Sequence, residues 1–158
     1  MMSHILFVCT GNIFRSMIAE HALRYTAGST ADYSFSSAGT EAKAQPMVEI
    51  VRQGLNARGI DPSGHVQRRL TPELFDGADL VVAMGLDHVA FIEETYKETP
   101  VLFDEVAYGR RQAILDTWEA VPDHETNAEA RDTHIRSVLN HIWDGAAPFL
   151  RNASGFIP

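Results

Sequence analysis

Within the first 26 residues, the spacing of apolar side chains changes from a continuous run to a helical repeat. Ile5–Val8 is a short, continuous apolar run, typical of a strand that is buried on both faces. Residues 15–26 instead repeat their apolar side chains every three or four positions, as an amphipathic helix does. Only the segment 9–14 separates the two patterns. The chain therefore opens with a strand, a tight loop and a helix, the unit from which parallel α/β sheets are built.

The same alternation continues along the chain. Thr71 precedes Pro72 as a helix N-cap precedes a proline at the first helical position. Residues 104–125 show no period and are expected to form a long loop. Further strands are expected at 33–37, 78–84 and 100–103, and further helices at 46–58, from 72 onward, at 87–96 and at 127–150. The sequence thus predicts an α/β fold with a parallel sheet flanked by helices, forming one domain over residues 1–158.

Charge and composition narrow the classes of function. The 158 residues carry 13 basic and 21 acidic side chains, a formal net charge of −8. General nucleic-acid binding needs a basic face, so we expect no nucleic-acid partner. No apolar run reaches the ~18 residues of a membrane span, and the first residues do not resemble a signal peptide, so we expect a cytoplasmic protein without membrane contact. Scattered histidines such as His134 and His141 do not predict a metal site, and no cofactor is expected.

The loop after the first strand has the composition of an anion-binding site. Cys9 is the only cysteine of the chain and follows the strand directly, where ligands bind in parallel α/β folds. Backbone N–H groups at the start of the following helix can surround an anion. Gly11 permits a positive φ and close approach of the backbone, and Asn12 tolerates the left-handed region. Such surroundings favour the nucleophilic thiolate form of a cysteine.

Two further residues of this segment suit phosphoryl transfer. Arg15 can hold two phosphoryl oxygens at once, because its guanidinium is planar and carries parallel donors. Ser16 can donate a hydrogen bond to the thiolate. The pattern predicts a phosphatase in which Cys9 attacks phosphorus and Arg15 stabilises the charge of the transition state.

Residues 8–20, Val-Cys-Thr-Gly-Asn-Ile-Phe-Arg-Ser-Met-Ile-Ala-Glu, closely resemble the opening of low-molecular-weight protein tyrosine phosphatases. The resemblance continues through residues 37–40, 59–68, 79–84 and 121–123. It implies a three-layer, flavodoxin-like domain with a four-stranded sheet, a phosphocysteine intermediate, no metal, and a monomer or weak dimer. The implied substrate is a phosphotyrosyl protein or a small aryl phosphate. The implied phosphate contacts are Thr10, Gly11, Asn12, Ile13, Phe14 and Ser16.

The resemblance also implies a general acid and a supporting set of polar residues. The acid is an aspartate in a late loop, and Asp123 after Pro122 is the expected match, with Asp116 in the same loop as the alternative. Asn12, Ser37 and His65 are expected to bond to one another and to hold the shape of the loop.

The chain departs from the family pattern in ways that leave other functions open. Phe14 stands where a second cysteine is usual, and the segment after Asp123 lacks the aromatic residue that walls the substrate slot. Tyr108 and Trp118 are candidates to replace that wall. A catalytically impaired phosphate-binding or interaction module is one alternative. An arsenate reductase that relies on an external thiol is another, because the chain has no second cysteine to resolve the intermediate.

Overall fold

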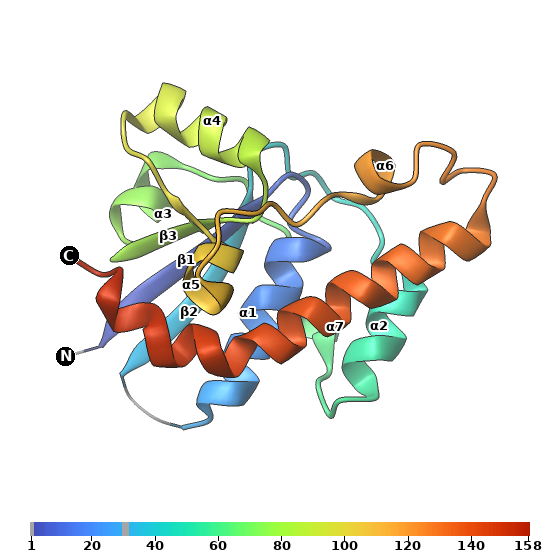
Figure 1. Cartoon of the computed structure of the whole chain (residues 1–158), viewed down its shortest axis with the longest axis horizontal. Coiled ribbons are helices and arrows are strands. Elements are labelled where there is room, and N and C mark those ends of the chain that lie inside the picture. The colour runs from blue at the N-terminus through green and yellow to red at the C-terminus, as the bar shows by residue number, and fades with distance from the viewer. Residues whose placement is uncertain (1, 30–31) are drawn as a thin grey trace.

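The computed structural model describes residues 2–29 and 32–158. Within these residues, four parallel strands form one sheet in the order β2-β1-β3-β4, so β1 lies inside the sheet and pairs with both β2 and β3. Figure 1 shows the strands in the middle of the molecule with helices above and below. The strands are β1 (Ser3–Cys9), β2 (Tyr33–Gly39), β3 (Leu80–Ala83) and β4 (Val101–Leu102).

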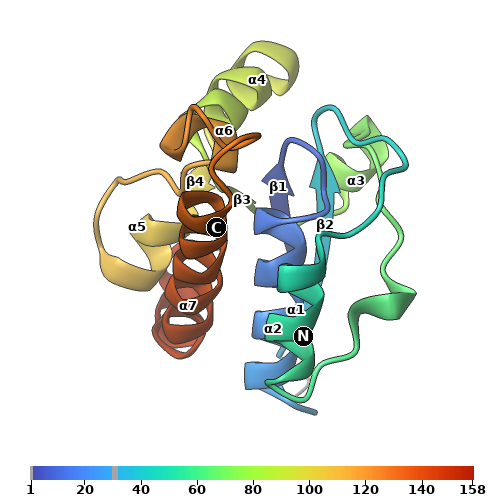
Figure 2. The same cartoon turned by 90° about the vertical axis from the view of Figure 1, so that its right-hand side faces the viewer.

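Helices cover both faces of this sheet, giving the three layers expected from the sequence. One face carries α1 (Arg15–Ala27), α2 (Glu49–Asn56), α5 (Phe103–Tyr108) and α7 (Ala128–Asn152). The other carries α3 (Pro72–Asp76) and α4 (Leu86–Tyr96). The long α7 packs against α1 and α2 (Figure 2). The short α6 (Thr117–Ala120) stands at the end of the sheet where β1 turns into α1 (Figure 1).

The core is organised by the alternation of side chains along β1. Ile5 and Phe7 face α1 and α7, whereas Leu6 and Val8 face α3 and α4, and all four are completely buried. Burial on both faces explains why the strand is continuously apolar. The ring of Phe7 lies 5.5 Å from that of Phe149, measured between centroids, so the last helix is fastened directly to the central strand.

The parallel α/β fold predicted from the sequence is confirmed, including the N-cap of α3. The Thr71 hydroxyl accepts from the Leu74 N–H at 3.2 Å, with Pro72 at the first helical position. The segment 104–125 is not the continuous loop that was expected, because α5 follows β4 without a break and α6 begins at Thr117. These two helices are too short for their apolar residues to show a period. Across residues 2–29 and 32–158, none of the helices combines the length and hydropathy that a membrane span requires.

Replacing Phe149 with alanine tests how strongly α7 is held by the core. The ring is fully buried between Phe7 and Phe103, so its loss removes apolar burial and leaves a cavity. We expect the free energy of unfolding in urea to fall by about 3–5 kcal/mol. Phe156→Ala is the matched control, because Phe156 is 36% exposed, and there we expect a loss below about 1 kcal/mol. Equal losses would contradict this account of the core.

Candidate active site

The loop between β1 and α1 turns its carbonyl groups away from its inner side. The Thr10 carbonyl accepts from the Glu41 N–H at 2.9 Å, that of Gly11 from Gln67 Nε2 at 3.1 Å, and that of Asn12 from His65 Nε2 at 2.6 Å. In a trans peptide the N–H of the next residue points opposite to the carbonyl. The N–H groups of residues 11–13 therefore point away from these partners, an arrangement suited to binding an anion.

Asn12 holds the loop in a conformation that few residues adopt. Its φ is +55°, in the left-handed region, and its side chain is completely buried. The sequence allowed a positive φ at Gly11 and the left-handed region at Asn12, and among the described residues of this loop Asn12 is the one that adopts it. Its amide nitrogen donates to Ser16 at 3.0 Å and to Ser37 at 2.8 Å, and its amide oxygen accepts from the Arg68 N–H at 3.0 Å. These three bonds fix the amide as well as the backbone.

The side chain of Asn12 belongs to a chain of hydrogen bonds that ends at the Cys9 sulfur. The Ser37 hydroxyl donates to the buried Glu20 carboxylate at 2.6 Å, so its oxygen is left to accept from Asn12. Ser16 likewise accepts from Asn12. The Ser16 hydroxyl proton is then available to the Cys9 sulfur, 2.9 Å away. The structure thus brings Asn12 and Ser37 together directly, and His65 joins them through the Asn12 carbonyl.

Arg15 begins α1 beneath the loop and is only 1% exposed. Its guanidinium donates to the Ile114 carbonyl at 2.8 Å and pairs with the Asp116 carboxylate at 3.2 Å. These partners follow it by about a hundred positions and belong to the segment before α6. The Arg15–Asp116 ion pair therefore connects the start of α1 to the segment that precedes α6.

A cavity of about 330 Å³ opens over the loop. Residues of the loop, of the 45–51 segment and of α6 enclose it, and Ile135 of α7 completes one side. Asn12 and Ser16 were also expected to touch phosphate; both residues are fully buried and neither lines the cavity, so a contact from Asn12 falls to its backbone N–H. The lining residues are Cys9, Thr10, Gly11, Ile13, Phe14, Arg15, Gln45, Val48, Val51, Asp116, Thr117, Trp118 and Ile135.

The two candidate acids lie in different places. Asp116 lines the cavity with Cys9, and α6 holds it there, since its N–H donates to Glu119 at 2.9 Å and its carboxylate accepts from the Thr117 N–H. Asp123 is exposed in the turn before α7, where its carboxylate accepts from Asn127 at 3.1 Å, and it does not line the cavity. Of the two candidate acids, therefore, Asp116 and not Asp123 lies at the cavity that Cys9 lines.

Residues 4–116 match the family model described as low molecular weight phosphotyrosine protein phosphatase. The chain belongs to this family. A low molecular weight protein-tyrosine-phosphatase of Klebsiella pneumoniae is 37% identical over 103 residues, which are 62% of this chain and 67% of that one. The Ptp phosphatase of Acinetobacter johnsonii is 34% identical over 101 residues, 59% of this chain and 64% of that one. The aligned segments thus span about two thirds of these relatives.

Solved structures agree on the fold over nearly the whole chain. A YwlE mutant of Bacillus subtilis superposes with a TM-score of 0.80 at 24% identity, covering 96% of this chain and 99% of that one. A low molecular weight protein tyrosine phosphatase of T. tengcongensis gives a TM-score of 0.78 at 24% identity, covering 94% and 98%. The flavodoxin-like fold expected for this phosphatase family is therefore confirmed.

His88 is a residue of the site that the sequence did not reveal. It lies in the first turn of α4 and is 1% exposed. Its Nε2 lies 2.8 Å from the hydroxyl oxygen of Thr10, in the loop between β1 and α1. Burial, together with the Arg15 cation, lowers the pKa of His88 to about 4 against the opposing effect of Asp87 and Asp116. The imidazole is therefore neutral at neutral pH. Its distance of 78 positions from Thr10 left no local signal.

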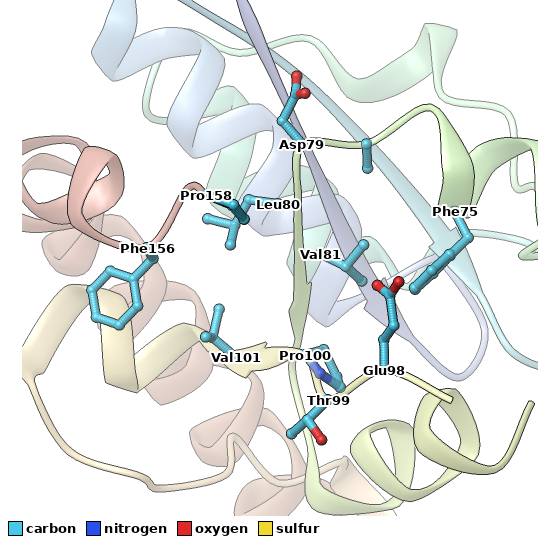
Figure 3. A pocket seen from close by; sticks show the side chains of 11 residues that line it. Phe75, Asp79, Leu80, Val81, Glu98, Thr99, Pro100, Val101, Phe156 and Pro158 are labelled. Atoms are coloured by element: carbon cyan, nitrogen blue, oxygen red, sulfur yellow. The ribbon is translucent and has the colours of Figure 1, made fainter. Parts of the chain in front are cut away.

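A second pocket, of about 180 Å³, lies at the opposite end of the sheet (Figure 3). Asp79 and Leu80 at the start of β3, Pro100 before β4 and Phe156, two residues before the last, line it. Figure 3 shows Glu98 pointing toward Val81 and Phe75, with Asp79 and Thr99 as further polar side chains among the apolar ones. Neither Cys9 nor Arg15 lines this pocket. Among the described residues, moreover, no three His, Cys, Asp or Glu side chains gather to hold a metal ion.

Gly39 at the end of β2 is expected to tolerate no side chain. A Cβ there would lie 2.4 Å from the Thr10 carbonyl oxygen and 2.9 Å from the Asn12 nitrogen, both backbone atoms of the loop. We expect Gly39→Ala to displace the loop, to lower phosphatase activity at least about tenfold and to destabilise the fold by about 1–3 kcal/mol. Activity and urea unfolding measure the two effects. Gly64→Ala is the control, because a Cβ there meets nothing within 4 Å, and unchanged activity in Gly39→Ala would refute the close contact.

The buried neutral His88 predicts a pH dependence of stability. Its ordinary pKa is 6.5 and its folded value is about 4, so between these values the unfolded chain binds a proton that the folded chain does not. Stability therefore falls as the pH drops through this window, by up to about 3 kcal/mol from this group. Urea unfolding at about pH 7 and about pH 4.5 should show a smaller fall in His88→Asn than in the unchanged chain. Parallel falls in the two chains would contradict the assignment.

Proposed function

We propose that the protein hydrolyses phosphate monoesters, with phosphotyrosine in proteins as the preferred substrate, through a phosphocysteine intermediate on Cys9. The observation that carries this proposal is the convergence of Cys9, Arg15 and Asp116 on one cavity. A nucleophile, an anion clamp and an acid are the groups that a metal-free phosphoryl transfer needs. Membership of a phosphatase family supports the same conclusion.

In the first step, the Cys9 thiolate attacks phosphorus, a sulfur–phosphorus bond forms and the bond to the ester oxygen breaks. Asp116 gives its proton to that leaving oxygen. In the second step, Asp116 accepts a proton from water, whose oxygen attacks phosphorus and releases the thiolate and inorganic phosphate. Ser16, 2.9 Å from the sulfur, stabilises the thiolate at the start and at the end.

Arg15 acts on the phosphoryl group throughout. Its guanidinium lines the floor of the cavity and is almost fully buried, where a cation interacts strongly with the charge that develops on the phosphoryl oxygens. The pair that it forms with Asp116 holds the acid on the same side of the cavity.

The walls of the cavity favour an aromatic ester. Phe14, Val48 and Trp118 present apolar side chains above the loop, and Trp118 is 59% exposed, as a residue at the rim would be. Trp118 supplies the aromatic wall that the residues after Asp123 lack. An aromatic ring that enters such a cavity gains apolar contact and ring packing. The preference for phosphotyrosine over small alkyl phosphates rests on these three residues.

Related folds host other phosphate chemistry. The YwlE protein of Geobacillus stearothermophilus, described as an arginine phosphatase, superposes with a TM-score of 0.78 at 22% identity. Phosphoarginine is therefore a useful comparison substrate for this chain. Arsenate reduction with an external thiol and phosphate binding without turnover are the other functions to be tested.

Hydrolysis of para-nitrophenyl phosphate by matched variants tests the nucleophile and the acid together. We expect Cys9→Ser to abolish turnover, because serine at this position is a far weaker nucleophile than a thiolate. We expect Asp116→Asn to lower kcat by about 10²–10⁴-fold, the usual contribution of general acid–base catalysis. Asp123→Asn, the same change on the acid outside the cavity, should stay within about twofold of the unchanged chain.

The outcomes separate the alternatives. A large loss in Asp123→Asn with none in Asp116→Asn would restore Asp123 as the acid. Activity equal in the unchanged chain and Cys9→Ser would refute the phosphatase and leave a phosphate-binding module. Phosphotyrosyl and phosphoarginyl peptides, compared by kcat/KM, then decide the substrate, and a higher value for phosphoarginine would overturn the proposed preference.

A further inference from the structure

The protonation of His88 follows from its hydrogen bonds. Its Nδ1 lies 3.0 Å from the backbone N–H of Gly85, which can only donate, so Nδ1 carries no proton. A neutral imidazole with a bare Nδ1 carries its proton on Nε2. Nε2 lies 2.8 Å from the Thr10 hydroxyl oxygen and 3.5 Å from the Asp87 carboxylate. The shorter contact is therefore a hydrogen bond from His88 to Thr10.

The surroundings of His88 are shaped to keep this arrangement. A Cβ on Gly85 would lie 2.7 Å from the Asp87 carboxylate, 3.2 Å from His88 Nδ1 and 3.3 Å from the Arg15 guanidinium, so glycine leaves room for all three groups. Arg15, Asp87 and Asp116 are the charged groups that act on the imidazole. A second cation beside Arg15 in a buried position is unfavourable, so the neutral form with its single donor is kept.

The bond from His88 also bears on the role of the Thr10 hydroxyl. Thr10 accepts at its hydroxyl oxygen, so its own proton is free for another acceptor. Thr10 follows Cys9 directly and lines the same cavity as Cys9 and Arg15. We propose that His88 is a positioning residue that orients the Thr10 hydroxyl to donate a hydrogen bond to the phosphoryl group bound over Cys9. This inference rests on the proposed phosphatase function.

The two residues would make the loop donate on both sides of the nucleophile. Ser16 accepts from Asn12 and keeps its own proton for the sulfur, and a Cys9 thiolate can only accept it. Thr10 donates to the phosphoryl oxygens from the cavity side. Arg15 and the loop N–H groups act on the same oxygens, and a neutral hydroxyl adds a donor without adding a charge that would have to be desolvated.

A double-mutant cycle tests the inference. Thr10→Val removes the hydroxyl but keeps the shape, and we expect kcat/KM for para-nitrophenyl phosphate to fall about tenfold, with weaker inhibition by orthovanadate. His88→Asn is too short to reach Thr10 but keeps an acceptor for Gly85, and we expect about a fivefold fall. Because His88 acts through the Thr10 hydroxyl, the double variant should be no worse than Thr10→Val alone. Thr10→Ser should keep at least half of the activity.

Several results would overturn the inference. Unchanged kcat/KM and vanadate inhibition in Thr10→Val would show that the hydroxyl does not touch the phosphoryl group. Losses that multiply in the double variant would show that His88 acts independently of Thr10. Thermal unfolding of every variant identifies any loss that comes from misfolding, and Thr10→Ser provides the folded comparison. Inactivity of the unchanged chain would instead refute the proposed function, and the inference with it.

Discussion

The left-handed backbone at Asn12 is the constraint on which the rest of the site depends. A side chain other than glycine is strained at φ +55°, and three side-chain hydrogen bonds with one carbonyl bond offset the strain. The partners come from α1, from β2 and from the 65–68 segment. The loop can therefore form only when the sheet and its helices are assembled around it, which explains why Asn12 is buried although it belongs to a functional loop.

The site is suited to an anion, although the protein as a whole is negatively charged. A protein with a formal net charge of −8 repels an anionic substrate at long range. At short range Arg15 and the inward N–H groups act across a few ångströms and out of water, where their effect is far larger than that of distant surface acids. The carboxylate of Asp116 lies against this cation and is thereby held at the cavity.

The direction of the hydrogen bonds around the loop follows from groups that can only donate or only accept. The Glu20 carboxylate can only accept and the N–H groups of Arg68 and Gly85 can only donate. From these fixed ends the roles of Ser37, Asn12 and Ser16 follow on one side of the loop. The roles of His88 and Thr10 follow on the other. A cavity lined mainly by apolar side chains thus presents donors to an anion because of residues that lie behind it.

The sequence by itself determined the α/β alternation, the placement of Cys9 at the end of a strand and the spacing of Cys9 and Arg15. These features are local, because a strand, a tight loop and a helix turn occupy adjacent residues and leave a periodic pattern. Only the tertiary structure placed Asp116 rather than Asp123 at the cavity, put Trp118 there as well and brought His88 to Thr10. Those contacts join segments about eighty to a hundred positions apart, and α6 is too short to show a pattern. Their positions depend on how β3, β4 and α7 pack, which no local spacing records.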